Sequence, residues 1–145
     1  MNIFLDTSSL FKLYHREGGT AEIEQLFAQN DINTVFLATL SKLEFRSIVW
    51  RRLRMKEITE QQGNTILQLF NQDYTRYTFI GFDEDLLIMA RQLLDKYAPN
   101  RSLRSLDAIQ LASAISIRDQ VGLFKTADTL LHSLFVAEDL PVTLS

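Results

Sequence analysis

Short apolar runs alternate with amphipathic segments along the whole chain. Residues 2–6 (NIFLD), 34–38 (TVFLA), 77–82 (YTFIGF), 122–126 (GLFKT) and 141–144 (PVTL) have the composition of buried strands. Between them, apolar residues recur at helical spacing over 7–14, 20–28, 41 onward, 59–72, 83–97, 105–118 and 129–136. Strands separated by helices indicate right-handed crossovers. The pattern therefore predicts an α/β fold, a three-layer α/β/α sandwich with a central parallel sheet.

No internal repeat, low-complexity stretch or linker interrupts this pattern, so residues 1–145 are expected to form a single domain. No apolar run approaches the ~20 residues of a membrane span, and the first residues lack the basic and apolar regions of a signal peptide. The chain contains no cysteine, which excludes disulfides, thiolate metal sites and a cysteine nucleophile. A cytoplasmic location without membrane association is expected.

Four acidic residues fall at the ends of predicted strands or in the first turns of predicted helices: Asp6, Glu44, Asp107 and Asp128. A parallel α/β fold gathers such positions at the carboxyl edge of its sheet. Two carboxylates ~5 Å apart repel by about 3 kcal/mol at an effective dielectric constant of ~20. A divalent cation relieves that repulsion, and hard oxygen ligands suit Mg²⁺ or Mn²⁺. The sequence thus predicts a metal-dependent enzyme.

Three of these acids also have a local structural explanation. Asp6 and Asp128 stand where helix N-caps are expected, and Ser41-x-x-Glu44 has the form of a capping box. Hydroxyl residues such as Ser8 lie close enough to cap the first helix instead, which would free Asp6 for another role. The metal hypothesis rests on all four acids occupying convergent positions together.

Asp107 is harder to explain as a cap. It lies in the first turn of a helix that is apolar on most sides and is therefore expected to be buried. The helix dipole favours an acid there by only about 0.3–1 kcal/mol, and burying an unpaired carboxylate costs several times more. Asp107 is therefore expected to have a charged partner, which is either Arg104 or a metal ion.

Positive charge is concentrated in one segment. Residues 41–58 hold six basic and two acidic residues, a net charge of +4, whereas the whole chain carries −3. A basic helix that begins beside Glu44 would hold a phosphate backbone next to the metal. Arg51 and Arg104 are the candidate RNA contacts, and structural salt bridges on a solvated helix face are the alternative.

Four segments, in this order and spacing, resemble the PIN domain, particularly the VapC-type ribonuclease toxins of toxin–antitoxin pairs: DTSSLFKLY (6–14), LSKLEFRSIVWRRL (40–53), LRSLDAIQLASAI (103–115) and FKTADTLL (124–131). The resemblance spans Asp6 to Val142 and implies a metal-dependent endoribonuclease that hydrolyses RNA with a metal-activated water. It also implies one or two Mg²⁺ or Mn²⁺ ions as cofactor. The acids Asp6, Glu44, Asp107 and Asp128 would be the catalytic residues and metal ligands. The hydroxyls of Ser8 and Thr126 would orient carboxylates or metal-bound water.

The resemblance further implies an RNA substrate, a cognate antitoxin whose tail lies across a groove near the acids, and a homodimer. Apolar residues on the early helices, among them Leu10, Phe11 and Trp50, are expected to supply more apolar surface than a monomer hides. The alternative for several of them is packing in the core. Trp50 is the candidate contact for the antitoxin.

Other enzyme classes fit less well. A haloacid-dehalogenase phosphatase needs a second Asp where Ser8 stands, and a receiver domain needs an acid where Leu5 stands. A metal-free ribonuclease needs an acid–base pair such as two histidines, but His15 and His132 are expected to be surface residues far from the acids. The remaining alternative is a non-catalytic RNA- or partner-binding module with the same fold.

Overall fold

The computed structural model describes residues 1–144, and the predicted strands and helices are all present there. The elements are β1 (Asn2–Leu5), α1 (Thr7–Phe11), α2 (Thr20–Gln29), β2 (Thr34–Ala38), α3 (Ser41–Arg54), α4 (Glu60–Gln72), β3 (Tyr77–Ile80), α5 (Glu84–Tyr97), α6 (Ser105–Ser116), β4 (Leu123–Thr126), α7 (Thr129–Ala137) and β5 (Val142–Leu144). Short 3₁₀ helices cover Asp73–Arg76 and Arg118–Gln120. The first helix is shorter than predicted: it ends at Phe11, and the residues that follow form turns.

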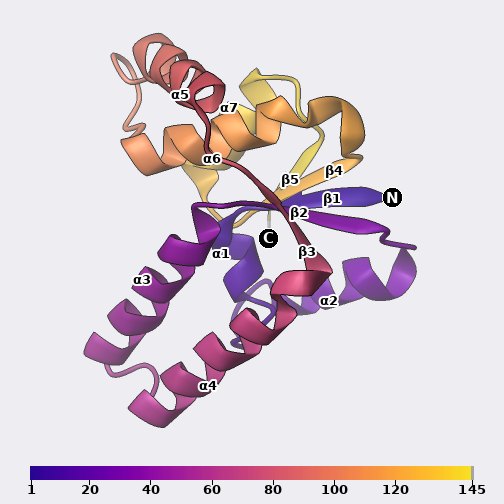
Figure 1. The fold of residues 1–145 in the computed structure, drawn as a ribbon, viewed down its shortest axis with the longest axis vertical. Coiled ribbons are helices and arrows are strands. Elements are labelled where there is room, and N and C mark those ends of the chain that lie inside the picture. The colour runs from indigo at the N-terminus through magenta and orange to yellow at the C-terminus, as the bar shows by residue number, and fades with distance from the viewer. Residues whose placement is uncertain (145) are drawn as a thin grey trace.

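The five strands form one parallel sheet in the order β3-β2-β1-β4-β5, with the first strand of the chain at its centre. Ile3 of β1 lies opposite Val35 of β2 on one side and Leu123 of β4 on the other. Helices α5, α6 and α7 cover one face of the sheet, and α1, α3 and α4 cover the other (Figure 1). This arrangement confirms the predicted α/β/α sandwich.

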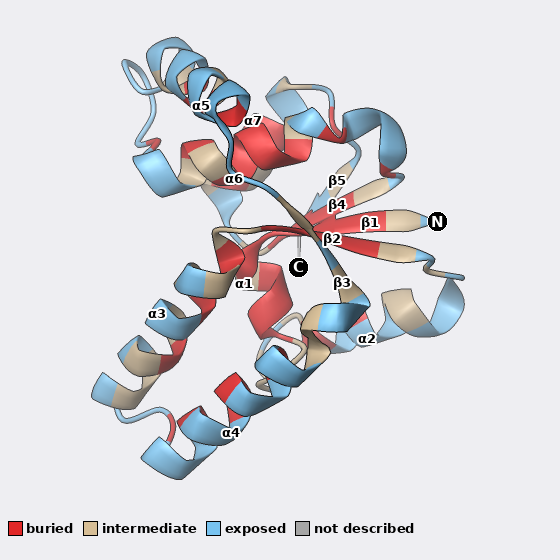
Figure 2. Ribbon diagram, in the orientation of Figure 1, coloured by how far each residue is buried: buried red, intermediate tan, exposed pale blue. Residues whose placement is uncertain are grey.

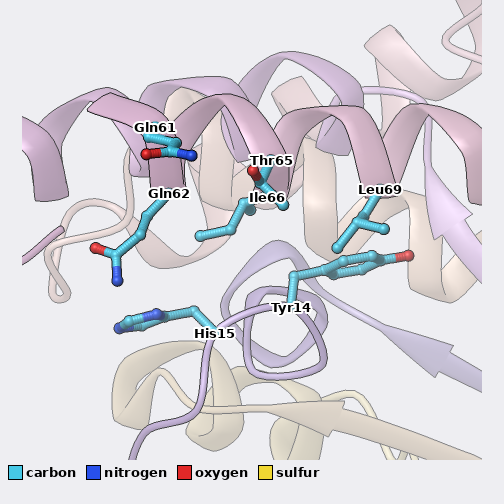
Figure 3. A pocket seen from close by; sticks show the side chains of 7 residues that line it. All are labelled: Tyr14, His15, Gln61, Gln62, Thr65, Ile66 and Leu69. Carbon is cyan, nitrogen blue, oxygen red and sulfur yellow. The ribbon is translucent and has the colours of Figure 1, made fainter. Parts of the chain in front are cut away.

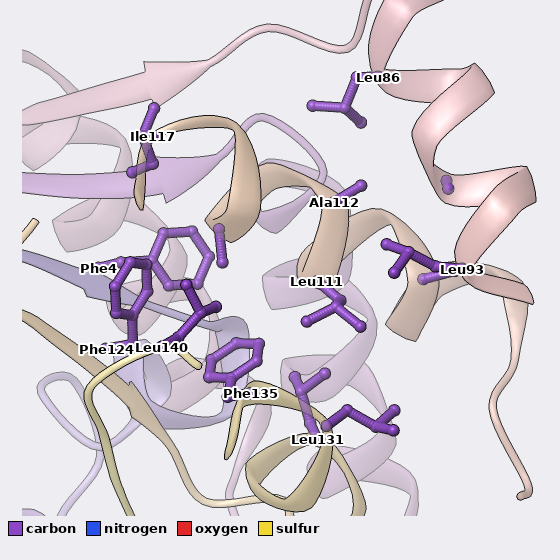
Figure 4. Packing of buried hydrophobic residues seen from close by; sticks show 14 of the residues in the cluster. Phe4, Leu86, Leu93, Leu111, Ala112, Ile117, Phe124, Leu131, Phe135 and Leu140 are labelled. Atoms are coloured by element: carbon purple, nitrogen blue, oxygen red, sulfur yellow. The ribbon is translucent and has the colours of Figure 1, made fainter. Parts of the chain in front are cut away.

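Side chains that alternate along each strand divide the interior into two cores. Phe4 and Phe124 point to the face covered by α5, α6 and α7 (Figure 4), and Phe36 belongs to the same core. The rings of Phe4 and Phe124 each pack against Phe135 of α7, with centroids 6.3 Å and 6.0 Å away. Helix α6 is central to this core, since Ala108 and residues 110–114 are buried (Figure 2). The prediction that this helix is buried is confirmed.

The second core lies on the other face of the sheet. Ile3, Leu5, Val35 and Leu37 pack there against α1, α3 and α4. Aromatic rings fill much of this core, as in the Phe45–Phe70 pair, whose centroids are 4.3 Å apart.

The apolar residues of the early helices contribute to this core. Leu10 and Phe11 are buried, and half-buried Trp50 packs against the same cluster. Helices α3 and α4 extend together away from the sheet (Figure 1), and they approach closely at Gly63, where a Cβ would lie 3.3 Å from Val49 Cγ1. The expectation of excess apolar surface is thus wrong for Leu10 and Phe11, because the fold itself hides them. None of the helices in residues 1–144 has the length and apolarity of a bilayer span.

Candidate functional site

The four predicted acids lie on elements that meet at the carboxyl edge of the two central strands. Asp6 directly follows β1, and Asp128 comes two residues after the end of β4. These strands are neighbours, and the Asp6 amide donates to the Lys125 carbonyl at 3.2 Å. Glu44 and Asp107 occupy the first turns of α3 and α6.

Asp6 is the most buried of the four acids, with 3% of its surface exposed. Its Oδ1 accepts hydrogen bonds from the Ser9 amide (2.9 Å) and the Ser8 hydroxyl (2.7 Å), and its Oδ2 accepts one from the Thr126 hydroxyl. Burial raises the pKa of Asp6 to about 6, although these three bonds act in the opposite direction. The N-cap prediction is correct for Asp6, and neither neighbouring serine replaces it as the cap.

Two hydroxyls connect Asp6 to the segment that follows β4. Ser8 Oγ accepts the Ala127 amide at 3.0 Å, and Thr126 Oγ1 accepts the Asp128 amide at 3.0 Å. Asp128 itself is exposed, and its Oδ1 caps α7 by accepting the Leu131 amide at 2.8 Å. Ser8 and Thr126 thus contact both the buried acid and the backbone beside the exposed one.

Glu44 does not take part in the predicted capping box. Leu40 occupies the N-cap position of α3 and makes no side-chain cap. Glu44 Oε1 instead accepts hydrogen bonds from the Thr7 hydroxyl (2.9 Å) and the Gln110 amide (2.7 Å). Burial and, to a smaller extent, the charge of Asp107 raise the pKa of Glu44, and the two hydrogen bonds oppose that rise.

Asp107 is half-buried at the start of α6. Its Oδ2 accepts only a long hydrogen bond of 3.3 Å from the Arg104 amide, and within residues 1–144 no ion pair joins it to the Arg104 side chain. Burial raises the pKa of Asp107, and the charge of Asp128 adds to that rise. Arg104 thus forms no salt bridge with Asp107, and its backbone hydrogen bond and its charge only partly offset the rise in the pKa of Asp107.

The acids form a chain of mutually repelling neighbours. Asp6 is affected by the charge of Glu44, Glu44 by that of Asp107, and Asp107 by that of Asp128. One carboxylate oxygen on each of Glu44, Asp107 and Asp128 accepts no hydrogen bond from the residues described.

The carboxylate oxygens are the donors that Mg²⁺ and Mn²⁺ prefer. However, no three acidic or histidine side chains in residues 1–144 are arranged to hold one ion. The donor chemistry thus fits a divalent cation, and the assignment of all four acids to one metal stays a prediction.

A groove of about 470 Å³ opens beside Glu44, between α3 and the start of α6. Arg51, Arg104 and the exposed aliphatic side chains of Leu43 and Leu106 line it with Glu44. A smaller hollow of about 170 Å³, which includes Ser8, Lys12 and Ala127, shares the Arg51 side chain with the groove. Arg51 therefore borders both the Glu44 side and the Asp6 side of the acidic edge.

Part of the basic segment has a structural role. Arg52 forms ion pairs with Glu17 at 2.8 Å and Glu57 at 3.0 Å. The Lys42 ammonium lies over the rings of Tyr74 and Phe79, 5.0 Å and 4.3 Å from their centroids. Arg46, Arg51 and Arg54 are exposed and form no ion pair within residues 1–144. These three cations remain for a ligand.

The two histidines lie on opposite sides of the sheet. His15, which follows α1, packs against Phe11 and lines a hollow of about 350 Å³ with Gln61, Gln62 and other residues of α4 (Figure 3). His132 belongs to α7, on the other face. Both are half-buried, not exposed as expected. They cannot form an acid–base pair, because the sheet separates them.

Three polar residues lie beside the acids, of which only Ser41 was singled out from the sequence, and only as part of a capping box. The side chains of Thr7, Ser41 and Gln110 are buried and hydrogen-bonded to one another. The sequence does distinguish Gln110, because it is a long polar side chain in an otherwise apolar stretch of a helix expected to be buried. Polar groups in such a place need hydrogen-bond partners. Its partners could not be identified, because they come from helices about 70 and 100 residues away in the sequence.

Solved structures share this fold. A VapBC2 complex from Rickettsia felis, bound to a promoter DNA fragment, contains a chain with 16% identity and a TM-score of 0.65, and the match covers 100% of this chain and 99% of that one. VapC20 from Mycobacterium tuberculosis, described as a sarcin–ricin loop cleaving toxin, has 16% identity and a TM-score of 0.68 over 91% and 94% of the two chains. FitAcB from Neisseria gonorrhoeae has 20% identity and a TM-score of 0.66 over 97% and 95%.

At these identities the structural likenesses show the fold alone. No curated protein sequence matches the chain. The sequence model of the PIN domain, in contrast, matches residues 3–134, which include most of β1, all four acids, both hydroxyls on Asp6 and the first two-thirds of α7. With this match over most of its length, and with the five-stranded parallel sheet in place, the chain belongs to the PIN domain family.

Proposed function

We propose that this protein is a divalent-metal-dependent endoribonuclease and the toxin component of a toxin–antitoxin pair. The observation that carries the proposal is the acidic edge: three carboxyl groups with raised pKa values, each repelled by the next acid, on elements that meet at the carboxyl edge of the central parallel strands. Such clusters of perturbed acids are characteristic of active sites.

Asp6, Glu44, Asp107 and Asp128 would hold Mg²⁺ or Mn²⁺, with Ser8 and Thr126 fixing the orientation of Asp6. When bound, the ion would neutralise charge on the phosphoryl oxygens and activate a water for hydrolysis. The protein's part is to gather the carboxyl groups at one edge and to orient them. Because water attacks instead of the ribose 2′-hydroxyl, the products are expected to carry 5′-phosphate and 3′-hydroxyl ends.

Arg51 and Arg104 would hold the RNA. Both line the groove that contains Glu44, and neither has an ion-pair partner within residues 1–144. Their guanidinium groups suit phosphate oxygens, so an RNA backbone laid along the groove would pass beside the acids.

The toxin assignment rests on the relatives. VapBC2 was solved with a promoter DNA fragment and FitAB with an IR36 DNA fragment, and VapC20 is described as a toxin that cleaves the sarcin–ricin loop. By analogy with such pairs, a cognate antitoxin and a homodimer are proposed as the partners of this chain.

The test is cleavage of labelled RNA by the purified, partner-free protein with Mn²⁺ or Mg²⁺. We expect cutting that disappears with EDTA and in Asp107→Asn but persists in Asp95→Asn, which changes an exposed acid on α5. Cutting that survives EDTA and Asp107→Asn would show that the acids are not catalytic. Folded protein that binds RNA but never cleaves it would favour the non-catalytic binding module.

A further inference from the structure

One side chain connects the segments that carry three of the four acids. The Gln110 amide nitrogen lies 2.9 Å from Thr7 Oγ1, 3.1 Å from Ser41 Oγ and 2.7 Å from Glu44 Oε1. Thr7 is adjacent to Asp6, and Gln110 lies one helical turn after Asp107. Gln110 therefore spans α1, α3 and α6 at the point where each helix presents an acid.

The direction of every hydrogen bond in this cluster can be assigned. Ionised Glu44 has no proton to give, so Thr7 (2.9 Å) and Gln110 both donate to it. The single hydroxyl proton of Thr7 is then used, so Ser41 must donate to Thr7 across their 2.9 Å contact. The second amide proton of Gln110 is shared between the hydroxyl oxygens of Thr7 and Ser41. The four side chains therefore form a closed ring of hydrogen bonds, in which Glu44 Oε1 only accepts.

The ring also explains why the Gln110 carbonyl is left without a partner. Gln110 is 3% exposed, and its Oε1 is buried with no hydrogen bond in the structure described. Turning the amide over would place that oxygen against Glu44 Oε1, an acceptor against an acceptor. A buried carbonyl without a partner destabilises a fold. Such departures from the ordinary rules of packing are expected at functional sites.

We propose that Gln110 is a positioning residue that fixes the Glu44 carboxylate relative to Asp6 and Asp107. With Oε1 held by two donors, the rotation of the carboxylate is restricted and Oε2 remains available for a ligand. This inference rests on the proposed function for its metal, but the hydrogen bonds that support it exist in the metal-free protein. The role is distinct from catalysis, because Gln110 acts on Glu44 and is itself buried.

The first test needs no metal. Gln110→Met keeps the length of the side chain and removes the amide, and Glu44→Gln removes the charge that the amide holds. Thermal unfolding of both single variants and the double variant gives a double-mutant cycle. We expect strongly non-additive shifts of the melting temperature. Additive shifts would mean that Gln110 does not hold Glu44 and would overturn the inference.

The second test measures Mn²⁺ affinity by calorimetry. Loss of a group that orients a metal ligand typically weakens binding about 10- to 100-fold, and we expect a loss of this size in folded Gln110→Met. The matched control is Gln68→Met, at an exposed position of α4, which should bind Mn²⁺ as the wild type does. Wild-type affinity in folded Gln110→Met would contradict the positioning role.

A second variant covers the case in which Gln110→Met does not fold. Gln110→Asn keeps a buried amide but shortens its reach by one methylene, so weaker Mn²⁺ binding is again expected, and wild-type affinity would again overturn the inference. If the wild type itself binds no Mn²⁺, the proposed function fails, and the double-mutant cycle still decides whether Gln110 holds Glu44.

Discussion

Thr126 donates its hydroxyl proton to Oδ2 of Asp6, although 120 positions separate the two residues in the sequence. The hydroxyl oxygen of Thr126 in turn accepts a hydrogen bond from the backbone amide of Asp128 at 3.0 Å. One hydroxyl on the last residue of β4 therefore connects the acid that follows β1 with the acid that follows β4. Because Thr126 is buried, water cannot replace it.

Thr126→Val should destabilise the protein more at pH 7 than at pH 4. The substitution preserves volume but removes a donor to the ionised Asp6, and hydrogen bonds to charged groups contribute about 1.5–3 kcal/mol. At pH 4 Asp6 is largely protonated, since its pKa is about 6, and the bond matters less. Chemical denaturation at both pH values measures the difference. Thr126→Ser, which keeps the hydroxyl, serves as the control, and an equal loss at both pH values would show that Thr126 does not act through the charge of Asp6.

Asp6→Asn should raise the melting temperature of the metal-free protein above about pH 6. The folded state holds the proton of Asp6 more tightly than the unfolded state, because the pKa rises from 3.8 to about 6. Stability contributed by this group is therefore present below pH 4 and lost as the pH rises to about 6, by up to about 3 kcal/mol. Differential scanning fluorimetry across pH 4–8 tests this.

Asp83→Asn is the matched control for that measurement, since Asp83 is an exposed acid that caps α5 through the Leu86 amide. It should show no comparable gain. A fall in melting temperature for both Asp6→Asn and Asp107→Asn at pH 7 would mean that these acids stabilise the fold as caps and not that they repel one another.

Mn²⁺ should stabilise the wild-type protein against heat, and EDTA should reverse the effect. A ligand at 100 times its dissociation constant adds about 2.7 kcal/mol to the free energy of unfolding. Asp107→Asn should lose most of this stabilisation, because it removes one carboxylate from the edge, whereas Asp95→Asn should keep it. Equal stabilisation of both variants would place the bound ion away from Asp107.

Arg51→Ala and Arg104→Ala should each weaken the binding of single-stranded RNA, measured in EDTA so that no cutting occurs. Loss of one phosphate contact should also reduce the slope of log affinity against log salt by about 0.7. Arg91→Ala, which removes an exposed arginine from α5, is the control for a general change in charge. Unchanged affinity and slope in both groove variants would exclude the groove as the RNA path.

The fold was predictable because hydrophobic spacing marks strands and helices independently of their partners. The apolar run TVFLA marks a strand and the apolar stretch around Leu111 marks a buried helix, and each pattern is complete within a few residues. The positions of Asp6 and Asp128 followed from topology, since residues that end parallel strands meet at one edge.

Specific hydrogen bonds were less predictable, because a side chain can bond either to its neighbours in sequence or to residues that the fold brings close. Ser41 and Glu44 have capping-box spacing, yet both turn to Thr7 and Gln110. A buried amide and hydroxyls from distant helices satisfy them better than the local turn does. The spacing rule considers only neighbouring residues, and for that reason it gave the wrong partner for Glu44.

The central position of β1 in the sheet has a consequence for the order in which the protein is made. Asp6 is among the first residues to be synthesised, but β4, which pairs with β1, and the Thr126 hydroxyl come at the far end of the chain. At about 5–20 residues per second, roughly ten seconds of translation separate the two. Until then Asp6 lacks the contacts that bury it, so a growing or prematurely released chain carries Asp6 without the surroundings that make it part of a site.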